Sequence, residues 1–328
     1  MKSMVGGGNY LLLSKIMTNS IEKDKDKNID WISSTDILEN TIREQMPGIL
    51  DILLIDRTTS TPKKKNNIIW ANENYVKFCS KAYAANAQML PELVTGRMGN
   101  IIRPRALKSK DMQKERTKSK AEVFTPTWIV KKQNDEVEKD YIRDDLETYV
   151  KRTWLEITAG EAPYMATRYD METGEIVPLT ERVGFVDRKL KHINIKVDDK
   201  AEWQRLVVEA YKSSYGFEWS GDSLLLAREN LLYTYRDYYF QKWLEEPTYG
   251  LFEDIAKIIS YNLFQMDGLK YIIPLTEKRE KIDEVQISIF DDEEPEEQWK
   301  IKPGKRVRVM NWETNRMEFF DKEVSRYE

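Results

Sequence analysis

The sequence predicts an α/β fold built on a mostly parallel sheet, and three observations support this prediction. Short apolar segments typical of buried strands occur at 154–157 and 214–219. A long segment with helically spaced apolar residues, 224–244, follows the second of them. A shorter apolar helix at 252–259 then leads into a third strand-like segment at 261–268. Strands that alternate with helices in this way are typical of parallel sheets.

Composition limits the chemistry that the chain can perform. The 328 residues include 52 Lys and Arg against 56 Asp and Glu, so the formal net charge is −4. Nine Trp, seventeen Tyr and ten Phe supply bulky core material and argue against disorder throughout. The single cysteine, Cys79, excludes a disulfide framework, and the single histidine, His192, excludes a metal site built on two histidines. We therefore expect no metal site.

The longest apolar stretches, such as 10–13 and 48–55, are far shorter than the roughly 20 residues that span a bilayer. Lys2 stands alone, and no adequate apolar core precedes Lys15, so the pattern does not predict a secretory signal. We expect a soluble cytoplasmic protein without a membrane partner. The sequence carries no indication of the oligomeric state.

The changes in composition suggest three regions. Residues 1–100 form an N-terminal accessory segment, for which we expect short strands at 46–55 and 67–70 joined by a hairpin-like loop rich in Thr, Asn and Lys. Residues 101–275 form the α/β domain. Residues 276–328 hold an acidic loop, with six acids within 291–297, and a short basic tail.

Charge is concentrated between residues 103 and 120, where eight basic residues and two acids give a local balance of +6. One interpretation is a stripe that contacts nucleic-acid phosphates, and the other is a solvated helix or linker. Charge alone does not decide between them. The eight basic residues are Arg103, Arg105, Lys108, Lys110, Lys114, Arg116, Lys118 and Lys120.

Three candidate ligand-binding positions follow the predicted strands, and ligands of parallel sheets bind at the carboxyl ends of strands. After the first strand comes a loop of small residues from Thr158 to Pro163, including Ala159 and Gly160, where the backbone can pass close to a ligand. Glu218 ends the second strand and can accept hydrogen bonds from ribose hydroxyls. Asp267 follows the third and can accept from an exocyclic amine. Together they predict a site for an adenosine-containing cofactor, although each acid alone is more often a cap.

Large aromatic residues fit a core interpretation first, and these are Trp128, Trp154, Tyr211, Trp219 and Trp243. Trp219 is the exception, because a ring directly after Glu218 can also pack against the adenine of a cofactor.

The segment 170–194 can be read as an insertion that contacts substrate or as a surface hairpin around Thr173 and Gly174, and we favour the hairpin slightly. His192 within it is expected to be structural.

The sequence resembles the adenine-specific DNA methyltransferases of restriction–modification systems over about residues 100–275. The resemblance lies in the segments 121–126 (AEVFTP), 155–160 (LEITAG), 215–218 (YGFE) with 226–232 (LARENLL), and 262–269 (NLFQMDGL). The whole chain also resembles short proteins labelled restriction endonuclease subunit M, which share Asp56-Arg-Thr-Thr59 and Gly160-Glu-Ala-Pro-Tyr164.

The resemblance implies a Rossmann-type methyltransferase fold with helices on both faces of the sheet, S-adenosylmethionine as cofactor and DNA as partner. By this resemblance Phe124, Thr125 and Pro126 pack over the methionine end of the cofactor, the 158–160 loop and Glu218 bind its remainder, and Asp267 meets the adenine amine. The family's catalytic motif, an acid or Asn followed by Pro-Pro and an aromatic residue, is absent, because no two prolines are adjacent. Glu161, Pro163 and Tyr164 are weak substitutes.

Three functions therefore remain open. The leading hypothesis is a DNA adenine methyltransferase-like subunit whose site is completed by a second restriction–modification subunit or by an unrecognised substitute motif. The second is a non-catalytic, DNA-binding module with the same fold. The third, with thin support from spacing, is a metal-dependent nuclease subunit that uses Asp56 or Asp187.

Overall fold

The computed structural model describes residues 46, 48–104, 125–281 and 299–324. The chain divides into two units, 1–35 and 36–328, and every described residue belongs to the second. Of the helices within these ranges, none combines the length and apolar character needed to cross a membrane.

A parallel sheet lies at the centre of the described residues, as the alternation of strands and helices predicts. Its strands are β1 (Trp154–Glu156), β2 (Ser214–Glu218) and β3 (Leu263–Gln265), arranged in the order β1-β2-β3. Both pairings are parallel, so all three strands end at the same edge. The predicted mixed α/β class and the parallel sheet are confirmed.

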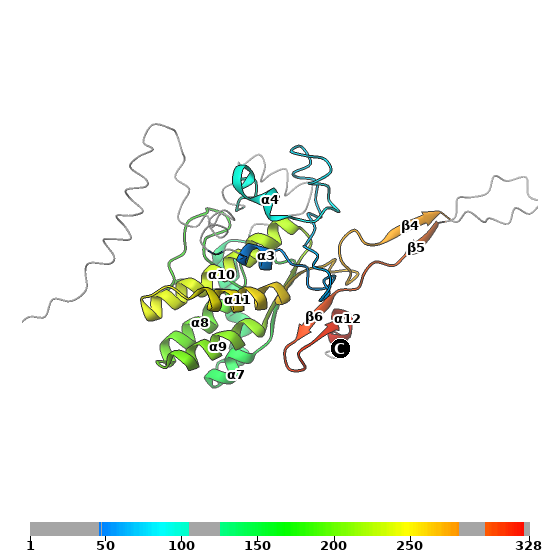
Figure 1. Ribbon diagram of the computed structural model, residues 1–328. Helices are drawn as coiled ribbons and strands as arrows, with labels where there is room; N and C mark the ends of the chain where they lie inside the picture. The colour runs from blue at the N-terminus through cyan, green and yellow to red at the C-terminus, as the bar shows by residue number, and fades with distance from the viewer. Residues whose placement is uncertain (1–45, 47, 105–124, 282–298, 325–328) are drawn as a thin grey trace, which may run out of the picture. The chain divides into compact units, whose positions relative to one another are not determined.

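Two pairs of helices connect these strands. Helices α8 (Phe185–Lys196) and α9 (Lys200–Lys212) lie between β1 and β2, and α10 (Gly221–Trp243) and α11 (Tyr249–Asn262) lie between β2 and β3. They pack against one another beside the sheet (Figure 1). The helices predicted at 224–244 and 252–259 are confirmed as α10 and α11.

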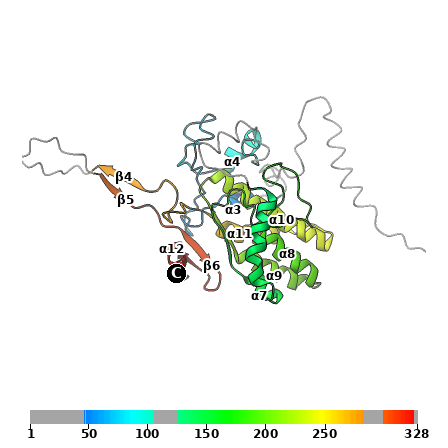
Figure 2. The ribbon, with the colours of Figure 1, turned by 180° about the vertical axis from the view of Figure 1, so that it is seen from behind.

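The two faces of the sheet pack against different partners. On one face, Trp154 and Leu263 belong to the main core formed with α8–α11. On the other, Phe217 and Phe264 pack against Val307, Val309 and Phe320. That second face is thus covered by the hairpin of β6 (Arg308–Asn311) and β7 (Arg316–Phe319) and by the start of α12 (Phe320–Val324), seen from behind in Figure 2. The resemblance implies helices on both faces. On this second face, a hairpin and one short helix take their place.

Two helices and a 3₁₀ turn lie directly before β1. Helix α6 (Thr127–Glu138) is followed by the 3₁₀ turn η4 (Lys139–Tyr141) and by α7 (Leu146–Lys151). The Asp170 carboxylate accepts a hydrogen bond from Thr127 N (2.9 Å) and so occupies one of the donors that a helix leaves free at its start. Trp128, expected in the core, is 66% exposed on α6, so that prediction is wrong.

A separate ribbon of two antiparallel strands follows the sheet. Its strands are β4 (Lys278–Lys281) and β5 (Trp299–Lys302).

The N-terminal segment contains helices where strands were expected. The run 46–55 forms α3 (Ile49–Leu53), in which Ile49, Leu50 and Leu53 are buried, and α4 (Pro91–Val94) and η2 (Gly96–Met98) follow it. Residues 67–70 form isolated bridges instead of a strand, with Ile69 opposite Gln88. The loop between them does turn back on itself as predicted, since Thr61 and Lys64 exchange backbone hydrogen bonds.

Candidate functional site

The carboxyl ends of the three strands meet, as the candidate site requires. Ala159 N donates to Phe217 O (2.8 Å), which joins the loop after β1 to β2. Met266 N donates to Glu218 O (3.0 Å), which joins the end of β3 to the end of β2. The structure thus brings Ala159, Glu218 and Met266 together at one edge of the sheet.

The loop after β1 has an unusual backbone. Thr158, Gly160 and Ala162 all have left-handed conformations, with φ of 48°, 57° and 59°. Such φ values favour glycine and cost non-glycine residues free energy. A Cβ added at Gly160 would meet no atom within 4 Å, so open space adjoins the backbone at this position.

Glu218 fastens this loop to the sheet. Its carboxylate accepts hydrogen bonds from Gly160 N (2.8 Å) and from Ser220 N (3.0 Å). Burial raises the pKa of Glu218, the N–H groups of Ser220 and Gly160 oppose that rise, and nearby Asp222 adds to it. Because a carboxylate can accept about four hydrogen bonds, these two leave acceptor positions for a ligand.

A second carboxylate beside this loop, Glu156, is not predicted from the sequence. It ends β1, is buried, and accepts hydrogen bonds from Tyr164 N (3.1 Å) and Met165 N (2.9 Å). Burial raises its pKa to about 8, despite the opposing effect of these two N–H groups. The only sequence signal was an acid inside an otherwise apolar strand.

Asp267 caps a turn. This is the structural role that an acid at the end of a strand most often has. Its Oδ1 accepts from Leu269 N (2.9 Å) and Lys270 N (3.2 Å). The same edge contacts the N-terminal segment, since Gln265 exchanges two hydrogen bonds with the backbone of Ile69. Sequence reasoning did not anticipate this contact.

Trp219 is held at the strand ends and remains accessible. Its indole Nε1 donates to Ala71 O (2.9 Å), and the side chain is 38% exposed. The ring therefore has a fixed position and an accessible apolar surface. Trp219 thus differs from a core residue, as its place directly after Glu218 suggests.

The weak catalytic candidates bond to different partners. Glu161 is buried, and its carboxylate accepts from the Tyr169 hydroxyl (2.5 Å), which also accepts from Asn230 of α10 (3.0 Å). The Tyr164 hydroxyl donates to Gln133 of α6. Pro163 between them is half-buried. These three residues therefore do not form one reactive group.

The segment Thr125–Pro126 lies next to the loop after β1. The Tyr164 hydroxyl is hydrogen-bonded to Thr125, and its pKa is raised by burial and by Glu156 and lowered by this bond. Helix α6 strengthens the contact, because Asn134 Nδ2 donates to Tyr164 O (3.1 Å). Phe124 lies outside the described residues.

Of the basic stretch, Arg103 alone belongs to the described residues, and its Nε donates to Asn100 O (3.0 Å). The positions of Arg105, Lys108, Lys110, Lys114, Arg116, Lys118 and Lys120 lie outside them.

The acids considered for a nuclease have structural partners. Asp56 accepts from Thr58 N (3.0 Å) and from the Thr59 hydroxyl. Asp187 is fully buried and accepts from Thr167 N (2.8 Å). Within the described ranges, no three His, Cys, Asp or Glu side chains are grouped so that they could hold a metal ion.

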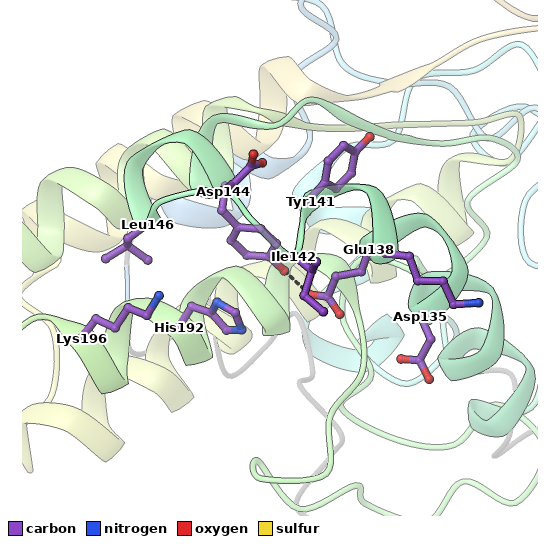
Figure 3. Close-up of a pocket in the computed structure, with 10 residues that line it drawn as sticks. Asp135, Glu138, Tyr141, Ile142, Asp144, Leu146, His192 and Lys196 are labelled. Atoms are coloured by element: carbon purple, nitrogen blue, oxygen red, sulfur yellow. Dashed lines mark hydrogen bonds between the residues drawn. The ribbon is translucent and has the colours of Figure 1, made fainter.

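A pocket of about 350 Å³ is formed by α6, η4, α7 and α8, with lining residues that are distinct from those of the strand ends (Figure 3). His192 stacks on Tyr149 in its wall, with ring centroids 4.8 Å apart, and burial lowers the pKa of His192. Glu138 at this pocket bonds to Tyr149 and Arg188. These contacts agree with the structural role expected for His192.

The comparisons with known proteins give no family assignment: no family model, no curated protein and no solved structure matches the chain.

Proposed function

We propose that the chain is an S-adenosylmethionine-binding, DNA adenine methyltransferase-like subunit of a restriction–modification system. The observation that carries this proposal is the hydrogen bond between Gly160 N and Glu218, because it couples the loop after β1 to the acid that ends β2. Loop and acid lie at neighbouring tips of a parallel sheet, which is the edge at which α/β proteins bind nucleotide-containing ligands.

The residues at the strand tips fit such a cofactor. The open space beside Gly160 admits a ligand close to the backbone. Glu218 has acceptor positions for ribose hydroxyls, and the accessible ring of Trp219 offers an apolar surface to adenine. Thr125 and Pro126, next to Tyr164, are available for the methionine end. S-adenosylmethionine supplies the electrophilic methyl group.

Catalysis requires a further component in this proposal. The adenine amine is a weak nucleophile, so the rate depends on holding it in line with the methyl group. The chain has no adjacent prolines, and Glu161 is buried against Tyr169. We therefore assign the binding of the flipped base to a partner subunit.

Isothermal titration of the full chain with S-adenosylmethionine tests the cofactor site. We expect Glu218→Gln to weaken binding by about tenfold or more, because hydrogen bonds to charged groups contribute about 1.5–3 kcal/mol. The matched control is Glu181→Gln at an exposed position, which should leave the affinity unchanged. Thermal melts of both variants verify folding. A wild-type chain that gives no heat, with or without DNA, contradicts the proposal.

A second candidate, the non-catalytic DNA-binding module, is favoured by one specific observation. Glu218 and Asp267 each accept hydrogen bonds from two backbone N–H groups, as is typical of carboxylates that cap turns and stabilise the fold. Transfer of a tritiated methyl group to unmethylated DNA separates the candidates. Labelled adenine supports the methyltransferase-like subunit, and DNA binding with neither labelling nor cofactor heat supports the module.

A further inference from the structure

The ribbon β4–β5 exposes every one of its eight residues. In its register Lys278 lies opposite Lys302, and Glu280 lies opposite Lys300. Because side chains alternate along a strand, these four residues share one face of the ribbon. The other face carries Arg279, Lys281, Trp299 and Ile301.

The ribbon is basic although the chain is not. Its eight residues contain five cations and one acid, so their charges sum to +4. The connecting sequence, 282–298, lies outside the described residues and carries eight acids, so the ribbon's charge does not appear in the net charge of −4. A dense row of Lys and Arg complements a polyanion.

The apolar residues of the ribbon do not pack into a core. Trp299 and Ile301 are 54% and 55% exposed. A two-stranded hairpin is only marginally stable by itself, and exposed apolar side chains on it gain little until a partner covers them. An accessible Trp beside cations is suited to stacking on a base as well as to packing on a sugar.

A pocket lies close to the ribbon in the sequence. It has a volume of about 270 Å³, and its wall includes Thr276, two residues before β4, and Lys305, three residues after β5. Lys64, Asn86 and Gln88 lie in the same lining, together with one acid, Asp56. Amides can pair with the edge of a nucleobase, and lysines can pair with the phosphate of the same nucleotide.

We propose that the β4–β5 ribbon and this pocket form a nucleic-acid-binding surface. The lysines and Arg279 contact the phosphate backbone, and the amide-lined pocket takes one nucleotide. A two-stranded ribbon is narrow enough to enter the major groove of B-DNA, which is about 12 Å wide. The inference rests on the proposed function for its choice of DNA as the partner, and it does not depend on the cofactor.

Fluorescence anisotropy with labelled duplex DNA, in the absence of S-adenosylmethionine, tests the surface separately from the cofactor site. The double variant Lys278→Ala/Lys300→Ala should weaken binding about tenfold and reduce the slope of log K against log salt by about 2, since each lost phosphate contact lowers it by about 1. The matched control is Lys132→Ala/Lys139→Ala, also two exposed lysines, which should bind as the wild type does. Asn86→Ala should weaken binding without changing the salt slope.

Several outcomes overturn the inference. They are the absence of DNA binding by the full chain, equal losses in the ribbon and control variants, and tighter binding to vesicles of anionic phospholipid than to DNA. Cofactor binding measured by titration stands or falls independently of each of these results.

Discussion

Glu156 illustrates how a single buried acid holds the candidate site together. Its two backbone hydrogen bonds join the end of β1 to residues 164 and 165, on the far side of the loop. Because its pKa is raised from 4.5 to about 8, the folded protein binds a proton at this carboxyl over a pH range in which the unfolded chain has released it. Its contribution to stability is therefore greatest at low pH and is lost as the pH rises from about 4.5 through about 8.

We expect Glu156→Gln to flatten this pH dependence. Glutamine has a similar shape and no charge, so it removes a slope of at most about 1.4 kcal/mol per pH unit. Urea unfolding of the wild type and the variant at pH 6 and pH 8.5 measures the difference. Identical pH dependence in both proteins would show that Glu156 does not titrate in this range.

The sequence predicts the position of Glu218 in the candidate site but not that of Glu156. Glu218 could be predicted because an acid that ends a strand lies at the ligand-binding edge of a parallel sheet. Glu156 could not, because its partners are backbone groups of a loop whose left-handed residues Thr158 and Ala162 give no local signal. A large aromatic ring such as Trp128 favours the core, whereas α6 turns this side chain towards solvent.

Among the elements, the start of α10 is the point where the N-terminal segment meets the sheet. Gly221 N donates to Trp70 O (3.0 Å), and a Cβ at Gly221 would lie 2.2 Å from Ile69 O. Asp222 in the same turn accepts from Asn72 (2.9 Å) and from the Tyr75 hydroxyl (2.7 Å). This packing leaves no room for a side chain at position 221.

Gly221→Ala should destabilise the protein by about 1–3 kcal/mol, the usual cost of overpacking. Gly250 offers a matched control, because it also lies in the first turn of a helix and an added Cβ there meets nothing within 4 Å. Gly250→Ala should be neutral or stabilise the protein by up to about 1 kcal/mol. Chemical denaturation of both variants measures this. Equal effects at the two positions would refute the close contact at Gly221.

Elements of strong periodicity were predictable, and short ones were not. The 23-residue helix α10 and the strands on either side of it follow the apolar pattern of the sequence. The apolar run 46–55 predicts a strand, but such a short run fits a buried helix equally well, and tertiary packing selects α3. The bonds of Gln265 to Ile69 join residues 196 positions apart, which no local pattern encodes.

For the molecule as a whole, the sheet is small for the proposed function. Among the described residues β1 pairs with β2 alone, and Leu155 and Ile157 near this edge are exposed. An unpaired strand edge and exposed apolar side chains favour contact with another chain, so this edge is where we expect a partner subunit to bind. The same expectation follows from the missing pair of prolines.

Hydrogen–deuterium exchange of the full chain, with and without S-adenosylmethionine, tests the central claim most directly. A ligand at the strand ends should slow amide exchange in peptides that cover 157–166, 217–220 and 266–268, because these backbones meet there. Peptides that cover 135–146, along the pocket of His192, should not change and serve as the internal control. Unchanged exchange at the strand ends under saturating cofactor, or protection confined to the control peptides, would contradict the account.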